Sequence, residues 1–140
     1  MAVFSKLSPS EYDGLYWARR QRRASKAEVA GELYLLKGRV KKGEPWFYKV
    51  GRSIDSNRRF LQHKKKCPIA RWTFVGRWRV NKSHTAERLT HLRMLAEGFE
   101  KLKRLCVCST LHNERFVHCA LTDKEAVLKI QRIILSHLQL

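Results

Sequence analysis

Hydrophobic positions follow a strand period in one part of the chain and a helix period in others. Apolar runs at residues 33–36 and 46–51 predict two strands, and the turn-rich segment from Gly38 to Pro45 predicts a hairpin loop between them. Residues 71–80 alternate, which predicts a third, half-buried strand. Its apolar face would carry Trp72, Phe74, Trp78 and Val80, and its basic face Arg71, Arg77 and Arg79.

Capping residues and apolar stripes predict the helices. Ser8-Pro9-Ser10-Glu11 is a capping box with proline at the first helical position, and the helix after it would turn inward Tyr12, Leu15 and Tyr16. Asp55 caps a second helix, which should end near Lys66 because Pro68 cannot continue it. A third helix is expected from about His84, on the stripe Ala86, Leu89, Leu92, Ala96 and Phe99.

The C-terminal part is predicted to hold a short strand at residues 114–121 and a last helix. Thr122-Asp123-Lys124-Glu125 is a second capping box, and the stripe after it consists of Val127, Ile130, Ile133, Ile134 and Leu138. These elements predict an α+β fold, sandwich-like, with a small three-stranded antiparallel sheet flanked by helices. A length of 140 residues with 44% hydrophobic content fits one globular domain at residues 31–140, preceded by a basic helical extension at 1–30.

The charge balance indicates a polyanionic partner. Lys and Arg number 30 against 12 Asp and Glu, a formal net charge of +18. No apolar run approaches the roughly 18 residues of a membrane span, and the N-terminus lacks the pattern of a secretory signal. We therefore expect no membrane partner and an intracellular location, nuclear if the source is eukaryotic and otherwise cytoplasmic. The pattern specifies no oligomeric state.

Four cysteines raise the question of zinc. A set formed by Cys106, Cys108, His112 and Cys119 is close in sequence, but the two-residue spacing usual between paired zinc-binding cysteines is missing. Buried or partly buried thiols are the expectation, and zinc is not.

Short motifs carry the functional information. Tyr34 lies in the first strand and Lys49-Val50-Gly51 in the second; Arg59 follows Lys49 by ten positions and His63 by fourteen; Glu87 follows an alanine in a later helix and precedes His91. In this order the motifs resemble the GIY-YIG nuclease superfamily, with Lys49 in place of its second tyrosine. Residues 106–116, with Cys-x-Cys and then His-x-Glu-x-Phe, are similar to the phage-type DNA-binding branch, also found in fungi. The resemblance covers roughly residues 31–138.

The resemblance implies a metal-dependent DNA endonuclease and a role for each matched residue. Tyr34 would act as general base toward water, helped by the positive charges of Lys49 and Arg59. Arg59 would also hold phosphate, and His63 would orient or relay a proton. Glu87 would bind one divalent ion, Mg²⁺ or Mn²⁺.

Each of these residues also has an ordinary interpretation. Tyr34 fits a core aromatic residue, Lys49 and Arg59 solvated charges, and Glu87 an exposed residue near a helix N-terminus. His63 fits a phosphate-contacting helix end. A DNA-binding module that cuts slowly or not at all is therefore the alternative function. A basic RNA-binding or ribosome-associated protein fits the charge but explains none of the spacing.

DNA affinity is expected mainly from phosphate contacts, so it should fall steeply with salt. The residues expected to supply these contacts are Arg19, Arg20, Arg22, Arg23, Arg52, Arg58, Lys64, Lys65, Lys66, Arg71, Arg77 and Arg79. For the arginines at 19–23, a solvated helix face is an equally good interpretation.

Overall fold

A computed structural model describes residues 7–22, 28–105 and 111–140, and of residues 103–105 and 111–113 only the backbone. The described residues form four helices and five strands. In chain order these are α1 (Pro9–Gln21), β1 (Gly31–Arg39), β2 (Phe47–Ser53), α2 (Ser56–Lys66), β3 (Arg71–Val80), α3 (Ser83–Ala96), β4 (Glu100–Leu105), β5 (Leu111–Val117) and α4 (Asp123–Leu135).

The sheet is antiparallel, with strand order β3-β1-β2-β5-β4. The predicted three strands are present as β3-β1-β2, but the prediction of a three-stranded sheet was wrong because β5 and β4 extend it beyond β2. The strand expected at 114–121 begins earlier, at Leu111, and ends at Val117. Its partner β4 was missed because the sequence Glu-Lys-Leu-Lys-Arg-Leu has no apolar run of the kind that marks β1 and β2.

The predicted faces of β3 were also wrong. The register against β1 shifts between Leu35 and Leu36, so an extra residue stands in β3 at Val75. Such an irregularity reverses the faces of the strand on either side of it. Trp78 packs in the main core, whereas Phe74 contacts Phe60 of α2 with ring centroids 5.5 Å apart. The aromatic residues of β3 therefore fill two layers instead of one.

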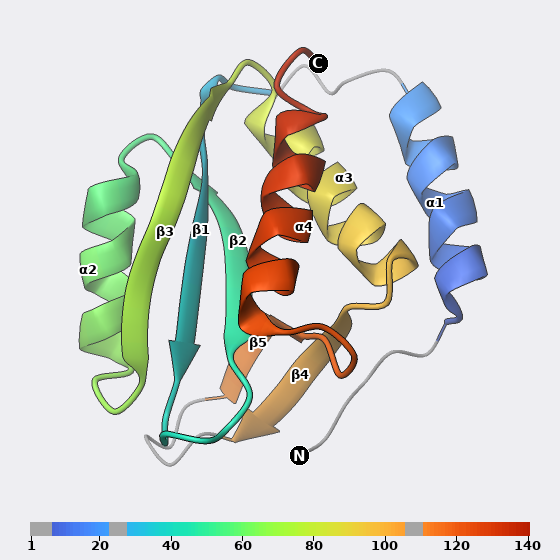
Figure 1. Ribbon diagram of the computed structural model, residues 1–140. Helices are drawn as coiled ribbons and strands as arrows, with labels where there is room; N and C mark the ends of the chain where they lie inside the picture. The colour runs from blue at the N-terminus through green and yellow to red at the C-terminus, as the bar shows by residue number, and fades with distance from the viewer. Residues whose placement is uncertain (1–6, 23–27, 106–110) are drawn as a thin grey trace.

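Helices cover both faces of the sheet (Figure 1). α2 lies on one face, and α3 and α4 cover the other. The main core lies between the sheet and α3 and α4 and includes Leu33, Leu35, Val50, Phe116 and Ile130. The predicted helix starts are confirmed: Ser8 and Thr122 form capping boxes, and the Asp55 side chain accepts the Arg58 backbone N–H at 3.1 Å.

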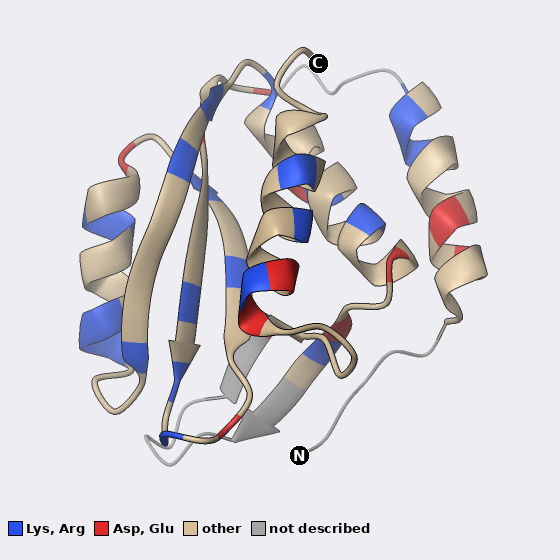
Figure 2. Cartoon of the chain, in the orientation of Figure 1, with Lys and Arg blue, Asp and Glu red and all other residues tan. Residues whose placement is uncertain are grey.

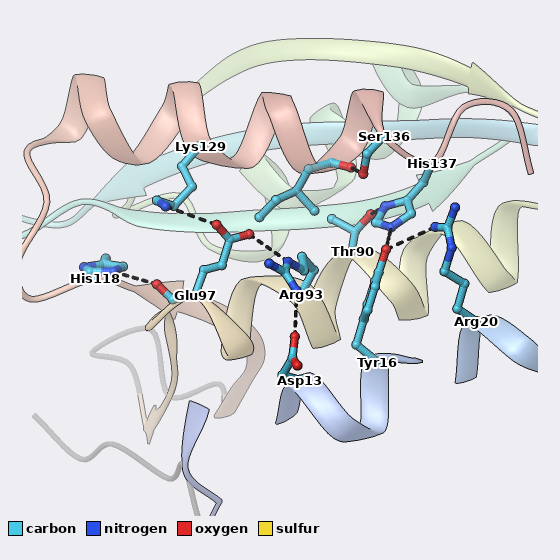
Figure 3. A network of polar contacts seen from close by, with 11 residues as sticks. Asp13, Tyr16, Arg20, Thr90, Arg93, Glu97, His118, Lys129, Ser136 and His137 are labelled. Carbon is cyan, nitrogen blue, oxygen red and sulfur yellow. Dashed lines mark hydrogen bonds and ion pairs between the residues drawn. The ribbon is translucent and has the colours of Figure 1, made fainter. Parts of the chain in front are cut away.

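α1 lies on the outer side of α3 and is held there by a buried polar network (Figure 3). The Tyr16 hydroxyl lies 2.8 Å from His137 Nε2, and Thr90 Oγ1 lies 3.1 Å from His137 Nδ1. Arg20 donates to the same hydroxyl, which leaves the hydroxyl proton for His137. Burial, with the nearby arginines, lowers the pKa of His137 to about 4, so the ring is neutral near pH 7.

Candidate active site

β1 and β2 bring two of the predicted residues to one face of the sheet. Tyr34 pairs with Gly51, and Leu36 with Lys49, so Tyr34 and Lys49 point to the same side. There they border a hollow of about 220 Å³. The hollow is lined by Tyr34, Lys49, Gly51, Arg52, Arg59, Glu87 and Glu114. Four of the five residues predicted to be catalytic therefore meet in one place, although they come from β1, β2, α2 and α3.

Gly51 provides the space for the phenol. A Cβ at this position would overlap the hydroxyl and ring of Tyr34, the residue across the strand pair. The ring is buried against β2, with its hydroxyl at the hollow. The glycine is thus a steric requirement of the site.

His91 sets the position of the helix that carries Glu87. β5 pairs with β2 only where Phe116 lies opposite Tyr48. The carbonyl oxygen of Val50, two residues further along β2, therefore needs a hydrogen-bond partner from outside β5. His91 Nε2 supplies it, donating to the Val50 carbonyl oxygen at 2.7 Å. Burial lowers the pKa of His91 to about 4, which keeps the ring neutral. Because Glu87 precedes His91 by four residues, it lies on the same helix face and reaches the hollow.

The fifth predicted residue, His63, contacts the hollow through Tyr34. Its Nε2 lies 3.0 Å from the Tyr34 hydroxyl. Burial lowers the pKa of His63 to about 3, helped by the positive charges of Lys49 and Arg59. The ring is therefore neutral, and its Nε2 can accept a hydrogen bond from the Tyr34 hydroxyl.

The surroundings of Tyr34 do not favour phenolate in the free chain. Burial raises the pKa of Tyr34, and a hydrogen bond from Arg59, with its charge, opposes that rise only in part. The Tyr34 hydroxyl therefore stands between a cation that favours phenolate, Arg59, and a neutral imidazole, His63.

Glu114 is a second carboxylate that the sequence analysis did not assign to the site. Its Oε2 lies 3.9 Å from Lys49 Nζ, and the Lys49 side chain is only 13% exposed. Burial lowers the pKa of Lys49, and the charge of Glu114 opposes this. Glu114 also has a backbone φ of 59°, which is uncommon for a residue other than glycine. The signal was in the His-x-Glu-x-Phe segment, but no spacing rule connects that segment to β2.

Glu87 and Glu114 are the carboxylates of the hollow that could contact a divalent cation. Burial raises the pKa of Glu87, with a further rise from Glu114, while Arg52 opposes it through its charge and a backbone hydrogen bond. Carboxylate oxygens are the ligands that Mg²⁺ and Mn²⁺ take, and Mg²⁺ commonly keeps several waters. Within the described ranges, no group of three or more His, Cys, Asp or Glu side chains could hold a metal. An ion at Glu87 and Glu114 would therefore keep most of its waters.

Comparison with protein families gives a match over these same elements. The T5orf172 domain matches residues 31–135, from the start of β1 to the end of α4. The chain belongs to the T5orf172 family. The matched range contains every residue of the hollow and agrees closely with the range over which the sequence resembles the phage-type branch. No curated protein and no solved structure matches the chain.

The basic residues expected to contact DNA come from two parts of the chain, and other Lys and Arg lie on α3 and α4 (Figure 2). One group is on β2, α2 and β3, and only Arg52 of this group lines the hollow: Arg52, Arg58, Lys64, Lys65, Lys66, Arg71, Arg77 and Arg79. The second group, Arg19, Arg20 and Arg22, is on or next to α1, on the opposite side of the sheet from α2. Arg20 there bonds Tyr16, which is a structural contact. Arg23 lies outside the described residues.

The predicted thiol positions are described in part. Cys67 is buried, and Cys119 is exposed with its Sγ 4.0 Å from Glu100 Oε2. Cys106 and Cys108 lie outside the described residues, and the side chain of His112 is not described. As to membranes, none of the helices in the described part of the chain has the length and apolar character needed to cross one.

Proposed function

We propose that this T5orf172 domain is a metal-dependent DNA endonuclease of the GIY-YIG superfamily. The observation that carries the proposal is the hollow itself. A phenol, three cationic side chains and two carboxylates line about 220 Å³ of an otherwise strongly basic protein. Hydrolysis of a phosphodiester needs these groups: a route for a proton, donors for phosphoryl oxygens, and oxygen ligands for a divalent ion.

In this mechanism the proton of the attacking water passes to His63 through Tyr34. The Tyr34 hydroxyl gives its own proton to His63 Nε2 and takes one from water, so phenolate need not accumulate beforehand. Burial, and after it the charges of Lys49 and Arg59, lower the pKa of His63 in the free chain, and phosphates entering the hollow would offset the charges. Bound substrate would thereby make His63 a stronger base.

Phosphate would be held by the cations of the hollow. Arg59 can present two parallel N–H donors to phosphoryl oxygens, whereas Lys49 acts as a point charge. Glu87 and Glu114 would hold Mg²⁺ or Mn²⁺, which when bound supplies charge stabilisation at the phosphate and leaving oxygen. Lys49 occupies the position of the superfamily's second tyrosine, and Glu114 is its counter-charge.

The second candidate function is a DNA-binding module on the same fold. The substitution of Lys49 for tyrosine favours it, because it removes one hydroxyl that the superfamily places at the site. The two candidate functions differ in whether the Glu87 carboxylate is useful to the protein. A pure binder gains nothing from a half-buried carboxylate facing phosphate, since the two negative charges repel.

Cutting of plasmid and branched DNA in Mg²⁺ or Mn²⁺ tests the proposal. Glu87→Gln should lower the cutting rate by roughly 100-fold or more while DNA binding without metal is kept or strengthened. Glu100→Gln, on β4 and outside the hollow, is the matched control and should cut at the native rate. A native chain that shifts DNA but never cuts it, with either metal, would instead establish the binding module.

A further inference from the structure

A second depression borders the hollow and shares Arg59 with it. Its volume is about 320 Å³, and it is lined by Ser53, Ile54, Asp55, Arg58, Arg59 and Gln62. It lies where β2 ends and α2 begins. If Arg59 holds the phosphate that is cut, the depression receives the nucleotide next to that phosphate.

Ile54 gives the depression an apolar wall on a fixed turn. The side chain is 87% exposed, the highest value among the large hydrophobic residues that the structure describes. Its backbone is nevertheless restrained: Ser53 Oγ donates to the Asp55 carbonyl oxygen at 2.9 Å and accepts the Asp55 N–H at 3.0 Å. The Asp55 carboxylate in turn caps α2. Folding fixes the position of Ile54 without burying it.

A single exposed isoleucine needs no explanation, but this one borders a depression whose other side chains are all polar or charged. Arg59 Nη1 donates to Gln62 Oε1 at 3.0 Å, which leaves the Gln62 amide N–H groups for another acceptor. Arg58 adds guanidinium donors and Asp55 an acceptor. A phosphate alone would have no use for an apolar wall or for a carboxylate. A nucleobase has both an apolar face and a polar edge, and it matches this lining.

We propose that this depression is a nucleobase subsite for the nucleotide adjacent to the phosphate that is cut. The base lies against Ile54, and Gln62 and Arg58 contact its edge. The inference rests on the proposed function, because Arg59 links the two sites. A paired and stacked base cannot reach such a subsite, so the protein should prefer DNA in which a base is unpaired or easily unstacked.

The test uses binding without metal to two duplexes, one fully paired and one with a single bulged 2-aminopurine. Anisotropy gives the affinity, and the fluorescence of 2-aminopurine reports unstacking. The native chain should bind the bulged duplex more tightly and raise its fluorescence. Ile54→Ala should lower that preference roughly three- to tenfold, because the apolar contact is lost. Leu61→Ala is the control: Leu61 is 64% exposed on α2 but does not line the depression.

The outcomes separate this inference from the proposed function. Equal behaviour of Ile54→Ala, Leu61→Ala and the native chain would overturn the subsite and leave the nuclease proposal standing. An Ile54-dependent fluorescence rise in a native chain that never cuts DNA would support the subsite and overturn the nuclease proposal. A native chain that binds neither duplex would overturn both.

Discussion

The protein contains two chains of hydrogen bonds with the same three residue types. On the side of α1, Arg20 donates to Tyr16, whose hydroxyl lies 2.8 Å from His137 Nε2 (Figure 3). At the hollow, burial raises the pKa of Tyr34 and Arg59 opposes the rise, and the Tyr34 hydroxyl lies 3.0 Å from His63 Nε2. Burial lowers the pKa of both histidines, to about 4 for His137 and about 3 for His63. The motif alone does not distinguish the two sites.

The surroundings do distinguish them. His137 is fully buried, and its second nitrogen is taken by Thr90. The nearby Arg93 is neutralised by Asp13 at 2.8 Å and by Glu97 at 3.1 Å. His63 is only part-buried, and the charges that lower its pKa are Lys49, Arg59, Lys66 and Arg115. Excess positive charge therefore remains around the hollow, whereas on the α1 side Arg93 is paired with two carboxylates.

The difference shows how similar contacts support different roles. Tyr16 also borders a depression, of about 270 Å³, but Arg93 and Lys129 in its lining are ion-paired to Glu97. At the hollow, the Tyr34 hydroxyl borders a space large enough for water and phosphate. The first set of contacts fixes α1 on α3, whereas the second is the one that we propose moves a proton.

The largest expected effect comes from removing one hydroxyl from each chain of bonds. Tyr34→Phe should lower the cutting rate by roughly 100-fold or more, because the proton route is lost, with little change in stability or DNA binding. Tyr16→Phe should leave the rate unchanged and lower the free energy of unfolding by about 1–3 kcal/mol, because His137 loses its partner. Cutting assays and denaturant unfolding measure the two effects. Equal loss of rate in both variants would remove the distinction.

Acid should weaken the α1 side in a defined pH range. Unfolded histidines take up a proton below about pH 6.5, whereas folded His137 does so only below about 4. Between these values the unfolded state binds more protons, so stability falls as pH falls, by at most about 1.4 kcal/mol per pH unit for each histidine. His137→Gln should flatten this dependence, measured by denaturant unfolding from pH 7 to 4. An unchanged slope would show that His137 is charged in the fold.

The smallest expected effect concerns salt. Arg58→Gln, beside the hollow, should weaken DNA binding and reduce the slope of log K against log salt by about 0.9, one phosphate contact. Arg22→Gln, next to α1, should change the slope much less, because it lies on the opposite side from α2. Anisotropy titrations at several salt concentrations measure both. A larger loss with Arg22→Gln would place the DNA across α1.

The sequence predicted the parts of the fold that depend on local signals. The capping boxes at Ser8 and Thr122, the Asp55 cap and the extent of β3 were all read from neighbouring residues. β4 was missed because its pairing with β5 is non-local and its own pattern is polar. The faces of β3 were misjudged because one extra residue at Val75 reverses them, and no residue type there marks the shift.

The same division holds for the site. Tyr34, Lys49, Arg59, His63 and Glu87 were predicted because their order and spacing resemble those of the GIY-YIG superfamily. The structure brings them together, and their catalytic roles stay predictions. Glu114 was not assigned because it enters the hollow from a strand whose register cannot be read from its own residues. The contribution of His91 was not predicted either, because it depends on the Val50 carbonyl oxygen, which lies beyond the part of β2 that pairs with β5.

Gly51 has a practical consequence. Any side chain there must displace the Tyr34 ring, while the surface cations on α2 are untouched. On the proposed function, Gly51→Ala should abolish cutting and leave DNA binding intact. Such a variant could be isolated as a complex with uncut substrate.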